Sequence, residues 1–233
     1  MKTSISPDLG LVSLIRNVLD GLKYFVLQAP LLDHLVYATP DLEATCRDLE
    51  IRLGARASAG GQHPGRGTHN ALISIGPKAY LEIIGPDPMQ PETRPVWFAI
   101  DRLTAPKLVT WAIRIDDIQG FAKEISPGAN VGLVRSGSRK TPDGATLSWQ
   151  LTEPQLEHGV GLVPFLIEWN AGQHPADSAV TGPRLVQLRI EHPEPESIRK
   201  QLKLLHLEVA IEQAASPALV SIFEGAGDLI ELR

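Results

Sequence analysis

The sequence predicts an α+β protein in which paired βαβββ modules form an open cleft, followed by a shorter related module at the C-terminus. The first observation is the order of an apolar strand, a capped helix and further strands within residues 31–88. The second is that this order recurs within residues 108–170, and the third is a shorter copy from residue 184 onward. A unit that repeats in this way indicates structurally related modules.

Length and composition are those of an ordinary soluble globular protein. The chain has 233 residues, of which 43% are hydrophobic and 21% charged, and this length suffices for a large core. A net charge of -5 argues against a nucleic-acid-binding protein, which would need a clustered basic surface. The single cysteine, Cys46, cannot form an internal disulfide, so we expect a cytoplasmic protein.

The first module begins with an apolar run, Leu32–Ala38, that contains one histidine, His34. Thr39, Pro40 and Asp41 end this strand and start a helix, because a polar cap, a proline and an acid suit the first turn. Apolar side chains then recur at helical spacing up to Gly54, a residue type that commonly ends helices.

The rest of this module consists of a loop and two strands. Glycines and a proline between residues 60 and 67 predict a loop without regular structure. Residues 68–75 alternate as a strand, and a turn leads into the strand 79–85, which carries Glu82. Burying a histidine or a carboxylate in an apolar strand is costly unless something pairs with it, so His34 and Glu82 are candidate site residues.

The second module repeats the strand order of the first. Thr110 has the position in its first strand that His34 has in the first module, and Glu168 has the position of Glu82 in its last strand. The stretch from residue 136 to 144 is basic and rich in turn-forming residues, which predicts a second loop.

The chain is therefore expected to divide into four parts. They are an N-terminal amphipathic helix, the two modules with their linkers, and a partial third module, at residues 1–30, 31–106, 107–182 and 183–233. The helix has no small-residue cleavage site, and charged residues interrupt its apolar run, so neither a signal peptide nor stable membrane insertion is expected. We expect it to pack on the body of the protein or on the partner in a homodimer.

Four phrases carry a resemblance to a known family. They are Leu32-Asp33-His34, residues 63–70, Tyr80-Leu81-Glu82 and residues 164–169. Their order and spacing resemble the glyoxalase-like branch of the vicinal-oxygen-chelate superfamily, the group of glyoxalase I, extradiol dioxygenases and bleomycin-resistance proteins. The resemblance covers residues 31–169 well and the C-terminal third more weakly.

The resemblance implies that two modules pair around a cleft lined by metal ligands. Carried over by position, His34, Glu82 and Glu168 match the ligand pattern, while Thr110 occupies the fourth position. One imidazole and two carboxylates suit a divalent ion such as Ni, Zn, Mn or Fe. Threonine is a poor ligand, which argues against an extradiol dioxygenase.

Further residues are candidates for the substrate-binding site. A guanidinium suits a substrate carboxylate, whereas a solvated loop arginine is the more ordinary interpretation of Arg139. Glu231 is expected to be structural, because its module is incomplete. The candidates for contact with a small-molecule substrate are His63, Thr68, His69, Asn70, Thr110, Arg139 and Trp149.

Three functions remain open at this point. The first is a divalent-metal-dependent lyase or isomerase acting on a small oxygenated metabolite, with Glu168 or Glu82 as the catalytic base. The second is a metal-free small-molecule binding or resistance protein of the bleomycin-resistance type, which Thr110 favours. The third is a homologue that serves only as a scaffold.

Overall fold

The computed structural model describes residues 32–125, 131–141, 144–170, 174–225 and 228–233. The predicted N-terminal helix, residues 1–30, lies outside the described residues. In the part of the chain that the structure describes, no helix has the length and apolar character needed to cross a membrane.

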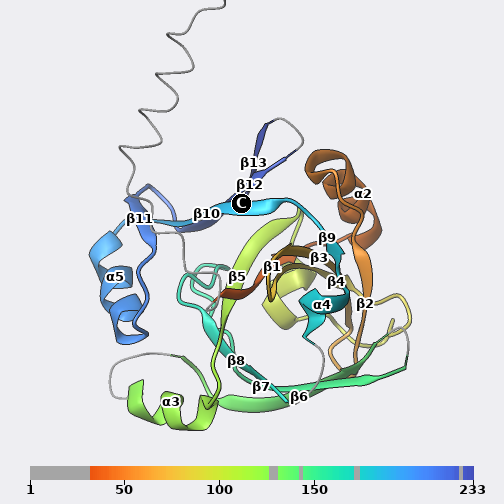
Figure 1. The fold of residues 1–233 in the computed structure, drawn as a ribbon, viewed down its shortest axis with the longest axis horizontal. Coiled ribbons are helices and arrows are strands. Elements are labelled where there is room, and N and C mark those ends of the chain that lie inside the picture. The colour runs from red at the N-terminus through yellow and green to blue at the C-terminus, as the bar shows by residue number, and fades with distance from the viewer. Residues whose placement is uncertain (1–31, 126–130, 142–143, 171–173, 226–227) are drawn as a thin grey trace, which may run out of the picture.

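Both predicted modules have the βαβββ order (Figure 1). The elements of the first are β1 (Leu32–Ala38), α2 (Leu42–Leu53), β2 (Ser58–His63), β3 (Thr68–Gly76) and β4 (Ala79–Pro86). Those of the second are β5 (Lys107–Arg114), α3 (Ile118–Ile125), β6 (Val134–Lys140), β7 (Thr146–Thr152) and β8 (Phe165–Trp169). The short helix η1 (Trp97–Arg102) lies in the linker between them, and α4 (Pro175–Ser178) and β9 (Val180–Thr181) follow the second module.

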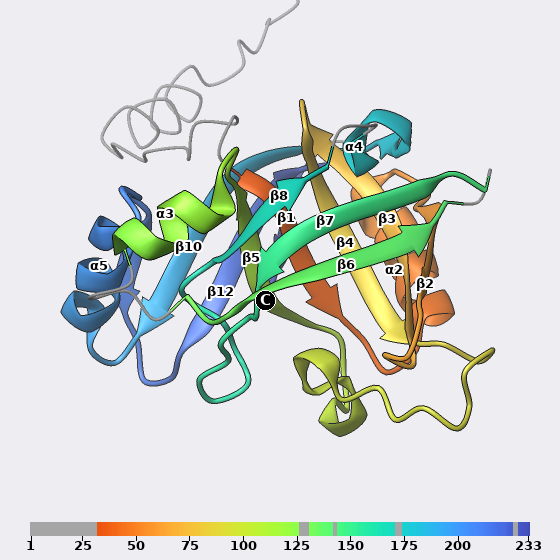
Figure 2. The ribbon, with the colours of Figure 1, turned by 90° about the horizontal axis from the view of Figure 1, so that it is seen from below.

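The two modules form one continuous curved sheet. Its strand order is β2-β3-β4-β1-β5-β8-β7-β6, with β9 paired to β3. The first and last strands of each module are parallel, and β1 and β5 are antiparallel where the modules meet. The antiparallel pair relates the modules by a pseudo-twofold axis, and Figure 2 shows β6 and β7 crossing in front of β1 and β4.

The C-terminal third forms a separate, smaller sheet. It contains β10 (Arg184–His192), α5 (Pro195–Leu204), β11 (Ala210–Gln213), β12 (Ala218–Glu224) and β13 (Leu229–Leu232). The strand order is β11-β10-β12-β13, and β10 is parallel to β11. This order differs from that of the two modules, in which the first strand is parallel to the last.

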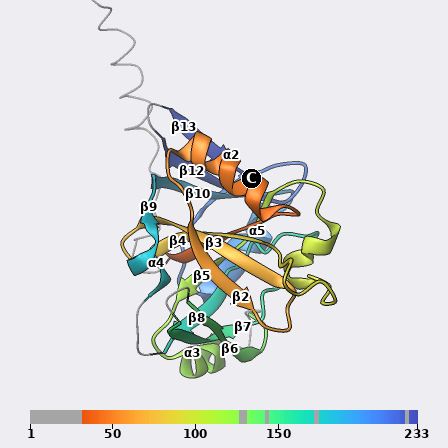
Figure 3. The same cartoon turned by 90° about the vertical axis from the view of Figure 1, so that its right-hand side faces the viewer.

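The large core lies between the two sheets, on the outer face of the curved sheet. Leu49 of α2, Trp111 of β5 and Phe223 of β12 are fully buried members of one cluster. Arg52 of α2 donates to the carbonyl of Glu231 in β13 at 2.9 Å, and Figure 3 shows this helix beside the smaller sheet. The smaller sheet therefore covers the outer face and leaves the inner face of the curved sheet for a site.

Two segments predicted as loops are strands, so these predictions were wrong. Gly61 lies in β2 and Gly137 in β6. A Cβ atom on Gly61 would lie 2.4 Å from the carbonyl oxygen of Lys140, and one on Gly137 would lie 2.5 Å from Nε1 of Trp149. These glycines permit close packing where the edge strands of the curved sheet approach each other, which a local propensity argument cannot detect.

The helix ends follow the expected chemistry, and the helix start is shifted by two positions. Asp41, rather than a residue before Pro40, is the N-cap of α2, and its side chain accepts from the backbone N–H of Ala44 at 2.9 Å. Gly54 ends the helix in the left-handed conformation with φ 71°.

Glu231 has ion-pair partners near the C-terminus, in line with the structural role expected for it. It accepts from Arg233 at 2.7 Å and from Arg189 at 3.3 Å.

Candidate functional site

The inner face of the curved sheet carries a histidine and a carboxylate that face each other. In the parallel pair of β1 and β4, His34 is opposite Tyr80 and Val36 is opposite Glu82, so these side chains lie on one face. His34 Nε2 is 3.8 Å from Glu82 Oε2, and both residues are buried. The His34 ring stacks on Tyr80 with 4.7 Å between the ring centroids, which holds its plane.

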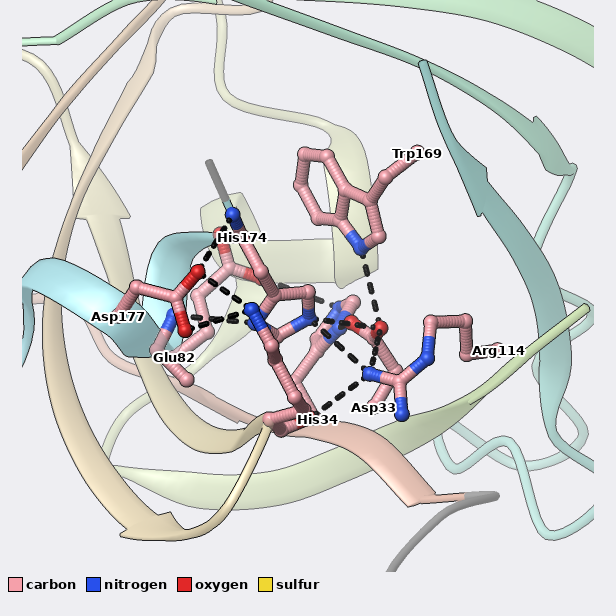
Figure 4. Close-up of polar contacts among 9 residues, drawn as sticks. Asp33, His34, Glu82, Arg114, Trp169, His174 and Asp177 are labelled. Atoms are coloured by element: carbon pink, nitrogen blue, oxygen red, sulfur yellow. Dashed lines mark hydrogen bonds and ion pairs between the residues drawn. The ribbon is translucent and has the colours of Figure 1, made fainter. Parts of the chain in front are cut away.

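Asp33 lies behind His34 and organises a buried polar network (Figure 4). Its Oδ1 is 2.7 Å from His34 Nδ1, and its Oδ2 is 3.0 Å from both Trp169 Nε1 and His174 Nε2. Arg114 Nη1 lies 3.6 Å from Oδ2. Burial alone would raise the pKa of Asp33, but the hydrogen bonds from His174 and His34 outweigh it and hold the pKa far below its usual value.

The charge of Asp33 decides which ring nitrogens carry protons. The N–H of Ala176 donates to Nδ1 of His174 at 3.1 Å, so the proton of that imidazole is on Nε2, which donates to Asp33. The ionised carboxylate of Asp33 accepts from Nδ1 of His34 in the same way. Nε2 of His34 is therefore the ring nitrogen that can exchange a proton with Glu82 or with a molecule in the space beside it.

The second oxygen of Glu82 is held by an amide. Asn70 Nδ2 donates to Glu82 Oε1 at 2.6 Å, and the same amide nitrogen is 3.5 Å from His63 Nε2. His63 Nδ1 is 3.0 Å from Thr68 Oγ1. Burial lowers the pKa of His63 to about 4 although Glu82 opposes the change, so His63 is neutral at pH 7.

Two adjoining cavities give access to these groups. The inner one has a volume of about 30 Å³ and is lined by His34, Glu82 and Arg139, among others. The outer one has a volume of about 760 Å³, and His63, Trp97, Trp149 and Leu151 line both. A molecule in the outer cavity would therefore lie next to the His34–Glu82 pair.

A comparison with protein families matches the glyoxalase-like domain over residues 32–206. The chain belongs to the glyoxalase-like domain family. It is therefore a member of the vicinal-oxygen-chelate superfamily, as the four phrases predicted.

Solved structures are similar to this glyoxalase-like chain in fold. A hypothetical protein from Staphylococcus aureus has a TM-score of 0.63 and 13% identity, covering 87% of this chain and 98% of its own. Methylmalonyl-CoA epimerase from Mycobacterium tuberculosis has a TM-score of 0.42 and 18% identity, covering 66% and 97%. The Streptomyces coelicolor epimerase with 2-nitronate-propionyl-CoA has a TM-score of 0.42 and 22% identity, covering 62% and 97%. The search of curated proteins gave no match.

The structure does not bring Glu168 to His34 and Glu82, so this predicted convergence was wrong. Along β8, Phe165, Ile167 and Trp169 line the inner cavity. Alternation therefore directs Glu168 to the opposite face, where its Oε2 accepts from the backbone N–H of Ile118 at 2.9 Å. Glu168 caps the start of α3, and its carboxylate is a structural group.

The register across the pseudo-twofold axis identifies the true counterpart of Glu82. The sequence comparison of the two modules sets His34 on Thr110, which places the axis at the pair of Leu35 and Trp111. The same axis exchanges Val36 with Ala112. Since Glu82 pairs with Val36, its counterpart is the residue that pairs with Ala112, which is Phe165. The sequence comparison of the two modules set Glu168 on Glu82, an odd number of residues away from Phe165. An odd displacement along a strand moves a side chain to the opposite face, so Glu168 does not lie on the inner face.

The residues of the second module do not fit the metal site that the family implies. The counterparts of His34 and Glu82 are Thr110 and Phe165. Thr110 is buried beside Gly161, and its hydroxyl has no hydrogen-bond partner among the described residues. The ring centroid of Phe165 is 5.3 Å from that of His34. A phenyl ring has no donor atom, and threonine is a weak ligand. No three His, Cys, Asp or Glu side chains among the described residues are grouped to hold a metal ion.

The other predicted substrate-binding residues divide between two faces. His63, Asn70, Arg139 and Trp149 line the inner cavity, and Thr68 supports His63. His69 instead lines a separate depression with Gln62, Lys140 and other residues.

Sequence reasoning missed Asp33, His174 and Phe165. An aspartate in an apolar strand was as costly to bury as His34, so the same argument would have found Asp33. His174 lies in the linker that follows the last strand of the second module, and no local signal marks it. The inward position of Phe165 depends on strand register, which only the paired strands establish.

Proposed function

We propose that this glyoxalase-like protein is an enzyme, an isomerase or lyase that moves a proton on a small oxygenated molecule. The observation that supports this function is the pair formed by His34 Nε2 and Glu82 Oε2, 3.8 Å apart beside a cavity. Asp33 supports His34 from behind, and Asn70 supports Glu82. A base oriented by a hydrogen-bonded partner is the usual arrangement in proton-transfer enzymes.

In this proposal Glu82 is the base that removes a proton from a carbon next to a carbonyl group. Asn70 occupies Oε1, so Oε2 is the oxygen that takes the proton. The electron pair of the broken C–H bond moves to the carbonyl oxygen, which becomes an enolate. Return of the proton to another atom or face gives an isomer, whereas departure of a neighbouring leaving group gives the product of a lyase.

His34 is the second proton carrier. Asp33 accepts from Nδ1 of His34 and fixes the orientation and tautomer of the ring, as a carboxylate beside the other ring nitrogen does in many acid–base sites. A proton carried on Nε2 of His34 can be donated to the enolate oxygen or to a carbon. The donor set does not fit the four-ligand metal centre, and the proton transfers are assigned to the side chains alone.

Deuterium exchange tests this function without a known substrate. Small 2-oxo and 2-hydroxy acids, aldehydes and ketones are incubated with the protein in D2O, and loss of C–H signals is followed by proton NMR. We expect catalysed exchange with at least one compound, and Glu82→Gln and His34→Gln should slow it about 10²- to 10⁴-fold. Glu168→Gln is the matched control, since its carboxylate lies on the other face, and it should leave the rate unchanged.

A metal-free binding protein is the second candidate. It is favoured by Thr110 and Phe165, which give the second module no reactive group at the counterpart positions, and by an outer cavity within the size range of ligand sites. Compounds that bind to the wild type without any exchange of their C–H protons would support this function and contradict the enzyme.

A further inference from the structure

Arg139 is a buried cation without an anionic partner among the described residues. Only 5% of its surface is exposed, its Nη1 has no hydrogen-bond partner, and no carboxylate of the described residues lies within 4.0 Å of the guanidinium. Burying an unpaired charge is among the most costly arrangements in a protein. A group that is retained at this cost is a candidate for binding an anion from solution.

The position of Arg139 on β6 directs it toward the His34–Glu82 pair. Every second residue of β6 lies on the same face of the strand, and one of these faces carries Arg135, Gly137 and Arg139. They pair with Leu151, Trp149 and Leu147 of β7. Arg135 lines the outer cavity, and its Nε donates to Glu153 at 3.1 Å. Arg139 lines the inner cavity and has no such partner in the part of the chain that the structure describes. The two arginines thus lie at successive depths of one strand, and only the outer one is paired with a carboxylate of a described residue.

The space beside Arg139 limits the size of the anion. An inner volume of about 30 Å³ holds about two water molecules, so only a small group of an anion fits beside Arg139. A guanidinium binds a planar carboxylate through two parallel hydrogen bonds. A phosphate dianion is larger and would be repelled by the nearby carboxylate of Glu82, so the pocket favours a monoanion.

We propose that Arg139 binds the carboxylate of the substrate and thereby holds the carbon that loses its proton beside Glu82 and His34. This inference rests on the proposed function and names the substrate class as carboxylic acids with a carbonyl or hydroxyl group near the carboxylate. The remainder of the molecule extends into the outer cavity along Trp149 and Trp97, which line both cavities.

The test measures binding of three simple acids, pyruvate, lactate and propionate, by calorimetry up to about 50 mM. Pyruvamide is the neutral control for pyruvate, and inorganic phosphate is the control for anions in general. We expect at least one acid to bind the wild type, and Arg139→Gln to weaken that binding at least about tenfold, the loss of one charged hydrogen-bonded contact. Arg184→Gln is the control for loss of a paired arginine and should change the affinity less than about twofold, because Arg184 is paired with Glu224 on the smaller sheet and lines neither cavity.

Thermal unfolding shows that the variant is folded. Arg139→Gln removes an uncompensated buried charge, so the ligand-free variant should unfold at a higher temperature than the wild type. The inference is overturned if no acid binds through Arg139, if Arg139→Gln binds as the wild type does, or if phosphate binds more tightly than the acids.

Glu82→Gln separates this inference from the proposed function. It should stop exchange but retain acid binding, since the guanidinium remains and the neighbouring negative charge is gone. Exchange that depends on Glu82 but not on Arg139 would overturn only the carboxylate site. Binding that depends on Arg139 without any exchange would overturn only the enzyme.

Discussion

Replacing His63 should change how the stability of the protein depends on pH. His63 is 5% exposed, and its Nδ1 is 3.0 Å from Thr68 Oγ1. Burial lowers its pKa from 6.5 to about 4, with Glu82 opposing. The unfolded chain therefore binds a proton between these two values that the folded protein excludes, and stability falls as the pH decreases through this window.

The size of the effect follows from the difference between the two pKa values. A difference of about 2.5 corresponds to about 3.5 kcal/mol, at about 1.4 kcal/mol for each pKa unit. The contribution is complete above the unfolded pKa of 6.5 and is lost as the pH falls toward 4. His63→Gln removes the titrating group and keeps a polar side chain at this position.

The free energy of unfolding is measured by urea unfolding, followed by circular dichroism, at several pH values between about 7.5 and 4. Other groups titrate in both proteins, so the comparison is the difference between their two curves. The wild type should lose about 3 kcal/mol more than His63→Gln over this range. Parallel curves would refute the assignment of a neutral buried His63.

Three further predictions concern the groups around the site. Asp33→Asn should lower the free energy of unfolding by about 3 to 5 kcal/mol in urea, because a buried anion that accepts three hydrogen bonds is lost; a change below about 1 kcal/mol would contradict this role. Glu168→Gln should cost about 1 kcal/mol in the same assay through the cap of α3, and a collapse of the fold would be unexpected. Thr110→His combined with Phe165→Glu should complete a four-ligand set. Millimolar Zn or Ni should then raise the melting temperature of the double variant, but not that of the wild type or of Thr110→His alone. An equal rise in all three proteins would contradict the strand register on which this prediction rests.

The sequence patterns typical of strands predicted the modules, because such a pattern depends only on which side chains within a short segment are buried. The apolar run around His34 and the strand of Glu82 are in place as β1 and β4. Both residues also lie together, since the turn between β3 and β4 and the parallel pairing of β1 and β4 bring them to one face.

The sequence by itself determined the fold class, the two modules and half of the site. It did not determine the strands at Gly61 and Gly137, because a glycine marks a loop locally and close packing only when its distant neighbour is known. Nor did it determine which way Glu168 points, because side chains alternate between faces and one step in register exchanges them. The tertiary structure decided these points, and it brought His174 to Asp33 across 141 positions of sequence. Contacts between distant segments depend on how the sheet curves and pairs, and no local pattern of residues encodes them.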